Sequence, residues 1–406
     1  MTATATAAPV GITRLGQVGA AIGVLGLAGL AFGIAGAHGD REIIKNVLQS
    51  YLYGWVMAML VALGCFGLML LQYMTRGSWA RPVIRLFEAG AKTLPLMFVL
   101  YLPMLIWSRY IYPWANPALV YGDAAHGIKA DATLLHRAGY MNVTTVLIRT
   151  VIYFVIWSMF TFILAQNAKR QDETGDLKLA MFRQKMSSYG FVIYVVTITL
   201  AFTDWIMSLD THWFSTIYGL WFMIFQGLAA MAFIGLFISR QKLAHKEPYA
   251  TLVTPQVTRD IGNMLLTLTM FWAYFSVSQW IIIWSGNLPE EITFYLRRNQ
   301  GTFLAVGALN IIFSFFAPFL LLLSSRNKRT AGRLGLICFM VIVMRFVDIF
   351  WIVVPVTRHP IQLIPTDVAG AAFAIGAFLA AFGYYATQSP ILPQPEEPLV
   401  LEAAHG

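Results

Sequence analysis

Charge is scarce in this sequence of 406 residues. Only 12% of the residues are charged, 58% are hydrophobic, and the mean hydropathy is +0.66. A soluble domain carries about 25% charged residues, so this much apolar side chain cannot be buried in one aqueous core. The scarcity excludes a water-soluble globular protein and predicts a polytopic membrane protein.

Cysteine is also rare, with two residues, Cys65 and Cys338, each alone in an apolar run. The sequence contains no C-x-x-C and no C-x-x-C-H motif. Covalently attached c-type haem, cysteine-ligated iron–sulfur clusters and zinc ribbons all depend on such clusters. Their absence predicts that this chain binds no such centre, and each cysteine is expected to be a small buried residue.

The seven histidines all fall in loops, tails or the ends of apolar runs. An embedded haem b needs histidines deep in facing helices, so such a haem is disfavoured. We therefore expect the chain to hold no metal and no redox cofactor of its own. The formal net charge of +9 lies mainly in short loops between apolar runs. That pattern is typical of topology determinants and lipid contacts and does not indicate nucleic acid binding.

A membrane-spanning helix needs about 20 apolar residues, and ten runs of the sequence meet this requirement. The predicted spans are 15–36, 51–74, 93–111, 142–166, 189–208, 216–238, 264–285, 302–324, 334–356 and 367–387. Lys and Arg are concentrated in the loops that follow the even-numbered spans. By the positive-inside rule, those loops and both termini are predicted to be cytoplasmic.

A weak internal repeat relates two parts of the chain. Phe202-x-Asp204 in the fifth span matches Phe346-x-Asp348 in the ninth, and Trp107-Ser108 matches Trp284-Ser285. A unit of four spans is even, so its two copies share one orientation, as parallel repeats do. The sequence predicts an all-α protein with two parallel four-helix bundles, made of spans two to five and six to nine, and one flanking helix at each end. The predicted units are 1–50, 51–215, 216–366 and 367–406.

Four ionisable side chains lie inside spans, where a central charge costs roughly 2.5–3.5 kcal/mol or more. They are Arg149 in the fourth span, Asp204 in the fifth, and Arg345 and Asp348 in the ninth. At about 1.5 Å rise per residue, all four lie in the outer half of the membrane. Arg345 and Asp348 are spaced i,i+3 and can pair directly.

Two interpretations of these groups remain open. In one, each bundle has an outward-opening polar pocket for quinone chemistry or proton transfer. In the other, the Arg and Asp side chains pair to hold helices together, and breaking a pair destabilises the fold whether or not it has a function. Asp204 is the stronger functional candidate because Asp210 and His212 follow within one or two turns.

Further candidates lie at the two membrane surfaces. On the outer side, His136 precedes the fourth span, and a histidine there can exchange protons near neutral pH. On the cytoplasmic side, Glu88, Lys92 and Tyr101 are candidates for an inner proton half-channel. The alternative for these residues is interfacial anchoring by a snorkelling lysine and belt tyrosines.

The run Ala201-Phe-Thr-Asp204-Trp-Ile-Met-Ser-Leu-Asp210, followed by His212-Trp-Phe-Ser-Thr-Ile-Tyr-Gly219, resembles a known family. It is similar to the NrfD-like family of polysulphide reductase membrane subunits. Within that family it is most similar to the NrfD-like chain of bacterial alternative complex III that lies beside the better-supported quinol site. The run Met344-Arg-Phe-Val-Asp348-Ile-Phe-Trp351 fits the same kind of chain. The likeness covers nearly the whole sequence and is weakest in the first 14 residues and the tail.

The resemblance implies a role in a complex of the bacterial inner membrane. Such complexes oxidise menaquinol and pass electrons, through partner subunits that hold iron–sulfur clusters and c-type haems, to a cytochrome c or similar acceptor. The better-supported quinol site belongs to the related NrfD-like neighbour. The resemblance thus implies a core subunit without its own redox cofactor, in contact with these partners and with membrane lipids, and with a proton route through each bundle.

Two alternatives stay open at this point. The first is a quinol-binding subunit in which His136, Asp204 and Arg149 line a pocket at the outer face. The second, more distant, is a secondary transporter, which predicts inverted repeats and helices broken near the midplane. The repeat is parallel instead, and the main interior breaks are Pro318 and Pro355.

Overall fold

The computed structural model describes residues 10–77, 79–301, 303–358 and 361–388. Within these ranges the chain is helical, and ten helical segments are long and apolar enough to cross a membrane. The predicted all-α membrane protein with ten spans is confirmed. Residues 1–9 of the predicted N-terminal arm and 389–406 of the predicted tail lie outside the described residues.

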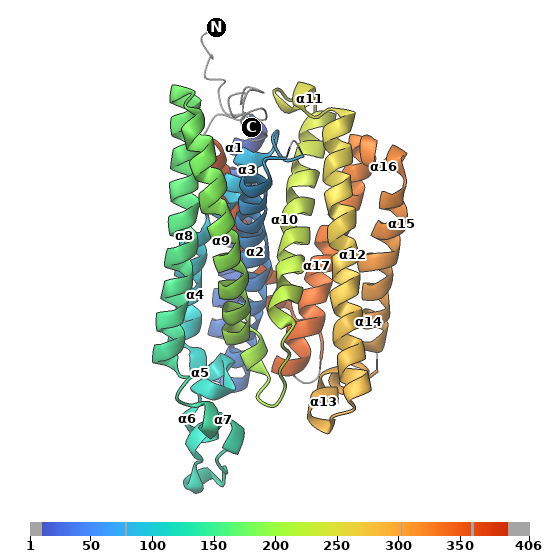
Figure 1. Cartoon of the computed structure of the whole chain (residues 1–406). Coiled ribbons are helices and arrows are strands. Elements are labelled where there is room, and N and C mark those ends of the chain that lie inside the picture. Colours follow the sequence, from blue (N-terminus) through green and yellow to red (C-terminus); the bar gives the residue numbers. More distant parts are fainter. Residues whose placement is uncertain (1–9, 78, 302, 359–360, 389–406) are drawn as a thin grey trace.

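The spans run in order along the chain (Figure 1). They are α1 (Val10–Gly36), α2 (Arg41–Thr75), α3 with α4 (Ile84–Ala91, Leu94–Ile106), α8 (Val143–Thr174), α9 (Leu177–Trp205), α10 (Tyr218–Leu243), α12 (Pro255–Gly286), α14–η4–α15 (Phe303–Ile311, Ile312–Phe316, Ala317–Leu323), α17 (Ala331–Thr357) and α18 (Pro365–Ala386). The short elements between them are α5 (Ser108–Ile111), η1 (Pro113–Ala115), α6 (Pro117–Tyr121), η2 (Ala124–His126), α7 (Ala132–Arg137), η3 (Met207–Leu209), α11 (Tyr249–Leu252), α13 (Pro289–Arg298) and α16 (Ser325–Arg329).

Several helices extend well beyond the predicted apolar cores. α2 begins at Arg41 instead of 51, because the Asp40 side chain caps it by accepting from the backbone N–H of Glu42 at 2.8 Å. The predicted unit boundary at 50/51 therefore falls inside a helix. α12 begins at Pro255 instead of 264, after Thr254 as N-cap. Hydropathy detects only the apolar part of a helix that lies within the membrane, whereas caps set its ends.

Two groups of four spans lie side by side (Figure 1). In the first group α2 packs against α3, α4 and α9, and α8 packs against α9. In the second group α10 packs against α12 and α17, and α12 packs against α15. The groups meet where α2 contacts α10. The contact is reciprocal: α2 of the first group also contacts α17 of the second, and α10 of the second group also contacts α9 of the first. Such reciprocity is the pattern expected of two like units related by rotation.

The first and last spans pack against each other. α1 lies along α18, and α18 also lies against α2 and α3. Small residues allow this approach: a Cβ placed on Gly376 would lie 2.3 Å from the backbone nitrogen of Gly23. Close backbone contact of this kind is how membrane helices gain packing energy. Both flanking helices therefore belong to the side of the first bundle.

Candidate functional site

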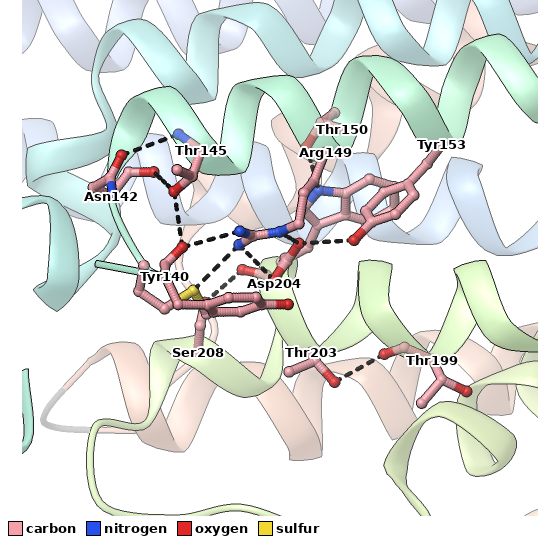
Figure 2. Close-up of polar contacts among 12 residues, drawn as sticks. Tyr140, Asn142, Thr145, Arg149, Thr150, Tyr153, Thr199, Thr203, Asp204 and Ser208 are labelled. Carbon is pink, nitrogen blue, oxygen red and sulfur yellow. Dashed lines mark hydrogen bonds and ion pairs between the residues drawn. The ribbon is translucent and has the colours of Figure 1, made fainter. Parts of the chain in front are cut away.

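Asp204 and Arg149 form a partly buried ion pair between α9 and α8 (Figure 2). Arg149 donates from Nε to Oδ2 at 2.8 Å and from Nη2 to Oδ1 at 3.0 Å. The Tyr153 hydroxyl, one turn further along α8, donates to Oδ2 at 3.1 Å. Asp204 is fully buried, so these donors replace the water that an ionised carboxylate would otherwise need.

Local structure positions both members of the pair. The Asn142 side chain accepts from the backbone N–H of Thr145 and caps α8, which places Arg149 two turns into the helix. Asp204 is the penultimate residue of α9, and the Ser208 hydroxyl donates to its backbone carbonyl at 2.5 Å. The pair thus lies at the end of the first bundle where α8 begins and α9 ends.

Arg149 connects the buried carboxylate to the protein surface at this end of the bundle. Its side chain is 18% exposed, and its guanidinium lies 3.8 Å from the ring centroid of Tyr140, a cation–π contact. Figure 2 shows the Tyr140 ring flat against the guanidinium. Nη1 of Arg149 donates to the Tyr140 carbonyl at 3.0 Å. The arginine therefore bridges a half-exposed tyrosine and a fully buried acid.

A buried layer of aromatic rings lies beside Asp204, on the side that faces the membrane interior. The Trp205 ring packs against the rings of Trp55, Tyr101 and Trp157. Trp205 Nε1 donates to the Thr150 hydroxyl at 3.1 Å. Tyr101 therefore lies in the Asp204 layer, about 20 Å along the third span from Glu88. The three residues predicted for an inner half-channel do not form one cluster.

The buried face of α9 carries a line of polar side chains. Arg183, Ser187, Tyr194, Thr197 and Asp204 are all buried, and their spacing of three, four or seven residues places them on one side of the helix. Over 21 residues the line spans about 30 Å. We call these five residues the α9 polar stripe. Serine and threonine in an apolar helix did not stand out in the sequence, although the regular spacing was a usable signal.

Neighbouring helices hydrogen-bond the middle of the α9 polar stripe. The Trp157 indole of α8 donates to the Thr197 hydroxyl at 2.8 Å. The Tyr194 hydroxyl donates to Oε1 of Gln226 on α10 at 2.6 Å. The stripe is therefore in contact with both α8 and α10.

Glu88 lies at the opposite end of the first bundle in a second buried charge cluster. It accepts two bonds from Nη1 of Arg85, at 2.8 and 3.0 Å, and one from the Tyr73 hydroxyl. Arg85 also pairs with Asp172 of α8. Arg183 of the α9 polar stripe lies over the Tyr73 ring, 5.1 Å from its centroid. Lys92 is the half-buried C-cap residue of α3.

The second bundle has its own ion pair, between Arg345 and Asp348 of α17. Asp348 also accepts hydrogen bonds from Asn310 of α14 and, at 3.2 Å, from Nε1 of Trp272. Arg345 lies between the rings of Phe225 and Trp272, at 5.4 and 5.5 Å from their centroids. Asn310 and Trp272 were not predicted. Asn310 lies on the eighth span, which is the equivalent of the fourth span that carries Arg149. In each half, this span therefore supplies a hydrogen-bond donor to the carboxylate of the same half.

The two bundles differ on the inner side of their carboxylates. α9 continues inward with the polar stripe, whereas the buried face of α17 continues with Val341, Cys338 and Leu334. Within the described part of α17, the side chains buried between Ala331 and Met344 are apolar. A buried polar line therefore continues from the carboxylate along α9 in the first bundle, and none continues along the described part of α17 in the second.

Three predicted residues lie away from Asp204. Asp210 is buried and pairs with Arg297 of α13 at 2.6 Å, which ties the end of the first bundle to the second. His212 faces Asp131 at 3.2 Å. His136 is exposed on α7. These three side chains therefore do not join the described hydrogen bonds around Asp204.

Two further buried arginines were missed in the sequence. Arg298 of α13 donates to the backbone carbonyls of Trp351 and Ile352 at 2.9 and 2.6 Å. Burial lowers the pKa of Arg298 to about 9, so the guanidinium is still protonated at neutral pH. Arg358 pairs with Asp367 at the start of α18 at 2.8 Å. Both arginines sit in loops or at helix ends, where an arginine gives no sign of burial.

No group of three or more His, Cys, Asp or Glu side chains that could hold a metal ion occurs within the described ranges. No protein-family model matches the chain, and no curated protein matches its sequence. The comparisons therefore do not show the family to which the chain belongs.

Proposed function

We propose that this chain is an integral membrane subunit of a quinol-oxidising electron-transfer complex of the bacterial inner membrane, and that it conducts protons through its first bundle. The observation that carries the proposal is the α9 polar stripe. It extends along one face of α9, from the charge cluster of Arg85 and Glu88 to the Arg149–Asp204 pair. Buried ionisable side chains inside spans usually mark proton or ion pathways.

The role within a complex rests on the sequence resemblance given above. The proposed partners are a related NrfD-like subunit, an iron–sulfur subunit and c-type cytochrome subunits, with menaquinol as the electron donor. These partners would carry the redox centres. The chain itself would scaffold them and move protons, and both of its termini would be cytoplasmic.

In this role, Asp204 would exchange protons with the outer side. The Tyr153 hydroxyl donates to it from within the bundle, and Arg149 holds the carboxylate from the outer side. A proton that reaches Asp204 weakens its pairing with Arg149, and its loss restores the pair. The half-exposed Tyr140 ring and the Arg149 guanidinium lie between this carboxylate and the outer surface.

The first experiment is to purify the tagged chain in mild detergent with its associated subunits. Absorbance of c-type haem and quinol:cytochrome c activity in the preparation support the proposed complex. A preparation that contains the chain alone, without haem and without quinol oxidation, contradicts it.

The second experiment compares electron transfer with proton release in Asp204→Asn. The amide keeps the shape and cannot lose a proton, so we expect proton release to fall at least about tenfold while electron transfer persists. If both fall together, Asp204 belongs to a quinol site. If neither changes in the assembled complex, the carboxylate is structural.

A matched pair of threonine variants on α9 separates the polar stripe from general packing. Thr197→Val removes a hydroxyl of the stripe, and Thr197→Ser keeps it. Thr199→Val removes a hydroxyl on another face, where it bonds only the carbonyl of Val195 in its own helix. Proton release should fall in Thr197→Val alone. An equal fall in Thr199→Val would contradict a route along the stripe.

A further inference from the structure

A cavity of about 530 Å³ lies in the outer half of the second bundle, with Asp348 and Asn310 in its wall. Its volume falls within the range of small-molecule sites, about 300–1,000 Å³. α12, α14, η4 and α17 form its sides, and Tyr295 and Asn299 lie at the end nearest the outer loops. We call this space the α12–α14 cavity.

Flat aromatic side chains dominate the lining. The rings that line the cavity include Trp221, Trp272, Trp280, Tyr295, Phe315 and Trp351. Such rings favour stacked or edge-on contact with another ring. The lining therefore fits a planar ligand better than a flexible acyl chain.

One hydrogen-bond donor in the lining has no partner. Nε1 of Trp351 is buried and makes no hydrogen bond with the described residues. It faces Gly307, since a Cβ placed on that glycine would lie 3.2 Å from it. A buried indole N–H normally finds an acceptor. An oxygen atom on a ligand in the α12–α14 cavity would supply one.

The mouth of the cavity faces lipid rather than water. Val277, Trp280, Leu304, Ile311 and Phe316 line it and are each about half exposed. They belong to membrane spans, so their exposed faces meet the hydrocarbon of the bilayer. Trp272 and Asp348, at 5% and 2% exposed, lie at the inner end. A ligand would therefore enter sideways from the membrane.

The helix that forms one side of the mouth is irregular at this point. Ile312–Phe316 is a π-helical turn, followed by Pro318. Proline lacks the N–H that would bond the carbonyl of Ser314, which accounts for a local change in helical hydrogen bonding. π-turns inside α-helices occur frequently at functional sites.

We infer that the α12–α14 cavity binds a lipid-soluble molecule with a flat ring that carries hydroxyl or carbonyl oxygens. The ring lies among the tryptophans, an oxygen accepts from Nε1 of Trp351, and an apolar tail extends past Leu304 and Phe316 into the bilayer. The inference rests on the proposed function in one respect, namely that a quinol-oxidising complex works among such molecules. It places the site in the second bundle, away from Asp204.

The test is photolabelling of the full chain in phosphatidylcholine nanodiscs with a short-chain azido-naphthoquinone. We expect saturable labelling of α12 and α14 peptides, which unlabelled naphthoquinone prevents. An alkyl naphthalene of equal size without oxygens should compete about two- to tenfold less well, the value of one neutral hydrogen bond. Trp351→Phe should weaken competition by the unlabelled naphthoquinone by about the same factor and leave competition by the alkyl naphthalene unchanged.

Two phenylalanine variants test where the ligand binds: one obstructs the α12–α14 cavity and the other is its control. Ala308→Phe adds a ring at the mouth of the cavity, and Ala305→Phe adds the same ring one turn away on α14, outside the lining. Labelling should fall at least about tenfold in the first and remain unchanged in the second. Equal labelling of the two phenylalanine variants would show that the ligand does not bind in the α12–α14 cavity. Competition by the alkyl naphthalene as strong as that by naphthoquinone would show that the ligand oxygen does not contribute to binding. Because binding is measured without turnover, failure here leaves the proton-release result for Asp204→Asn unaffected.

Discussion

The buried arginines of this protein have different kinds of partner. Arg149 meets a carboxylate through two parallel hydrogen bonds, and Arg345 meets one within its own helix. Arg298 instead donates to backbone carbonyls. One of these, the carbonyl of Trp351, is the group that would have bonded the N–H of residue 355, and that residue is Pro355. The arginine thus satisfies an acceptor that the proline leaves free.

This pairing of Arg298 with Pro355 predicts a coupled effect on stability. Arg298→Met should lower the free energy of unfolding by about 2–3 kcal/mol, because buried carbonyls lose their donors. In a Pro355→Ala background the loss should be about 1 kcal/mol smaller, since the alanine N–H can bond the carbonyl of Trp351. Unfolding by denaturing detergent, followed by tryptophan fluorescence, measures both.

The control for this cycle is Arg326→Met, an exposed arginine of α16. It should change the unfolding free energy by no more than about 0.5 kcal/mol. Equal losses from Arg298→Met in the two backgrounds would show that the arginine and the proline are independent.

At the scale of helices, glycine decides how closely the two bundles approach. α2 meets α10 at Gly64, where an added Cβ would lie 2.0 Å from the carbonyl oxygen of Gln226. This distance leaves no room for any side chain, and backbone cannot swing aside. The same Gln226 accepts from Tyr194 of the α9 polar stripe. The α2–α10 contact therefore supports the bundle interface and one partner of the stripe together.

Replacement of Gly64 should consequently disturb the helix pair. Gly64→Ala is expected to destabilise the protein by about 1–3 kcal/mol or more through overpacking. Gly286→Ala is the matched control, since a Cβ there meets nothing within 4 Å. It should be neutral or slightly stabilising, because alanine favours the helix. A Gly64→Ala protein that unfolds at the same temperature as the control would disprove the close contact.

At the scale of the whole molecule, the two halves are alike in framework and different in content. Each has four spans and a buried carboxylate with an arginine partner. The first half adds a polar line along α9, and the second adds a cavity lined by aromatic rings. The Asp210–Arg297 pair joins them at α13. A repeat of this kind can divide two tasks between two copies of one framework.

Orientation in the membrane is open to a direct test. Positive-inside counting predicts that Glu173, in the last turn of α8, is cytoplasmic and that Ala130, before α7, is outside. Both are exposed, while Cys65 and Cys338 are buried and should not react. In intact cells a membrane-impermeant maleimide should therefore label Ala130→Cys and spare Glu173→Cys. The opposite pattern would invert the proposed topology.

Much of the framework could be predicted without coordinates. Ten spans and the four ionisable residues inside them follow from one-dimensional signals, because lipid demands long apolar helices and penalises unpaired charge. The i,i+3 spacing of Arg345 and Asp348 was sufficient to pair them. Helix ends were harder, as the early starts of α2 and α12 show, since caps outside the bilayer carry no hydropathy signal.

By itself, the sequence determined the class of protein, the number of spans and the few charges that membrane burial makes costly. Only the tertiary structure decided which helices bring partners to those charges. Arg149 reaches Asp204 from another span, Asn310 and Trp272 reach Asp348, and Asp210 turns instead to Arg297. The reason is physical: hydropathy and spacing are properties of one helix, whereas a buried side chain is satisfied by groups that neighbouring helices place beside it.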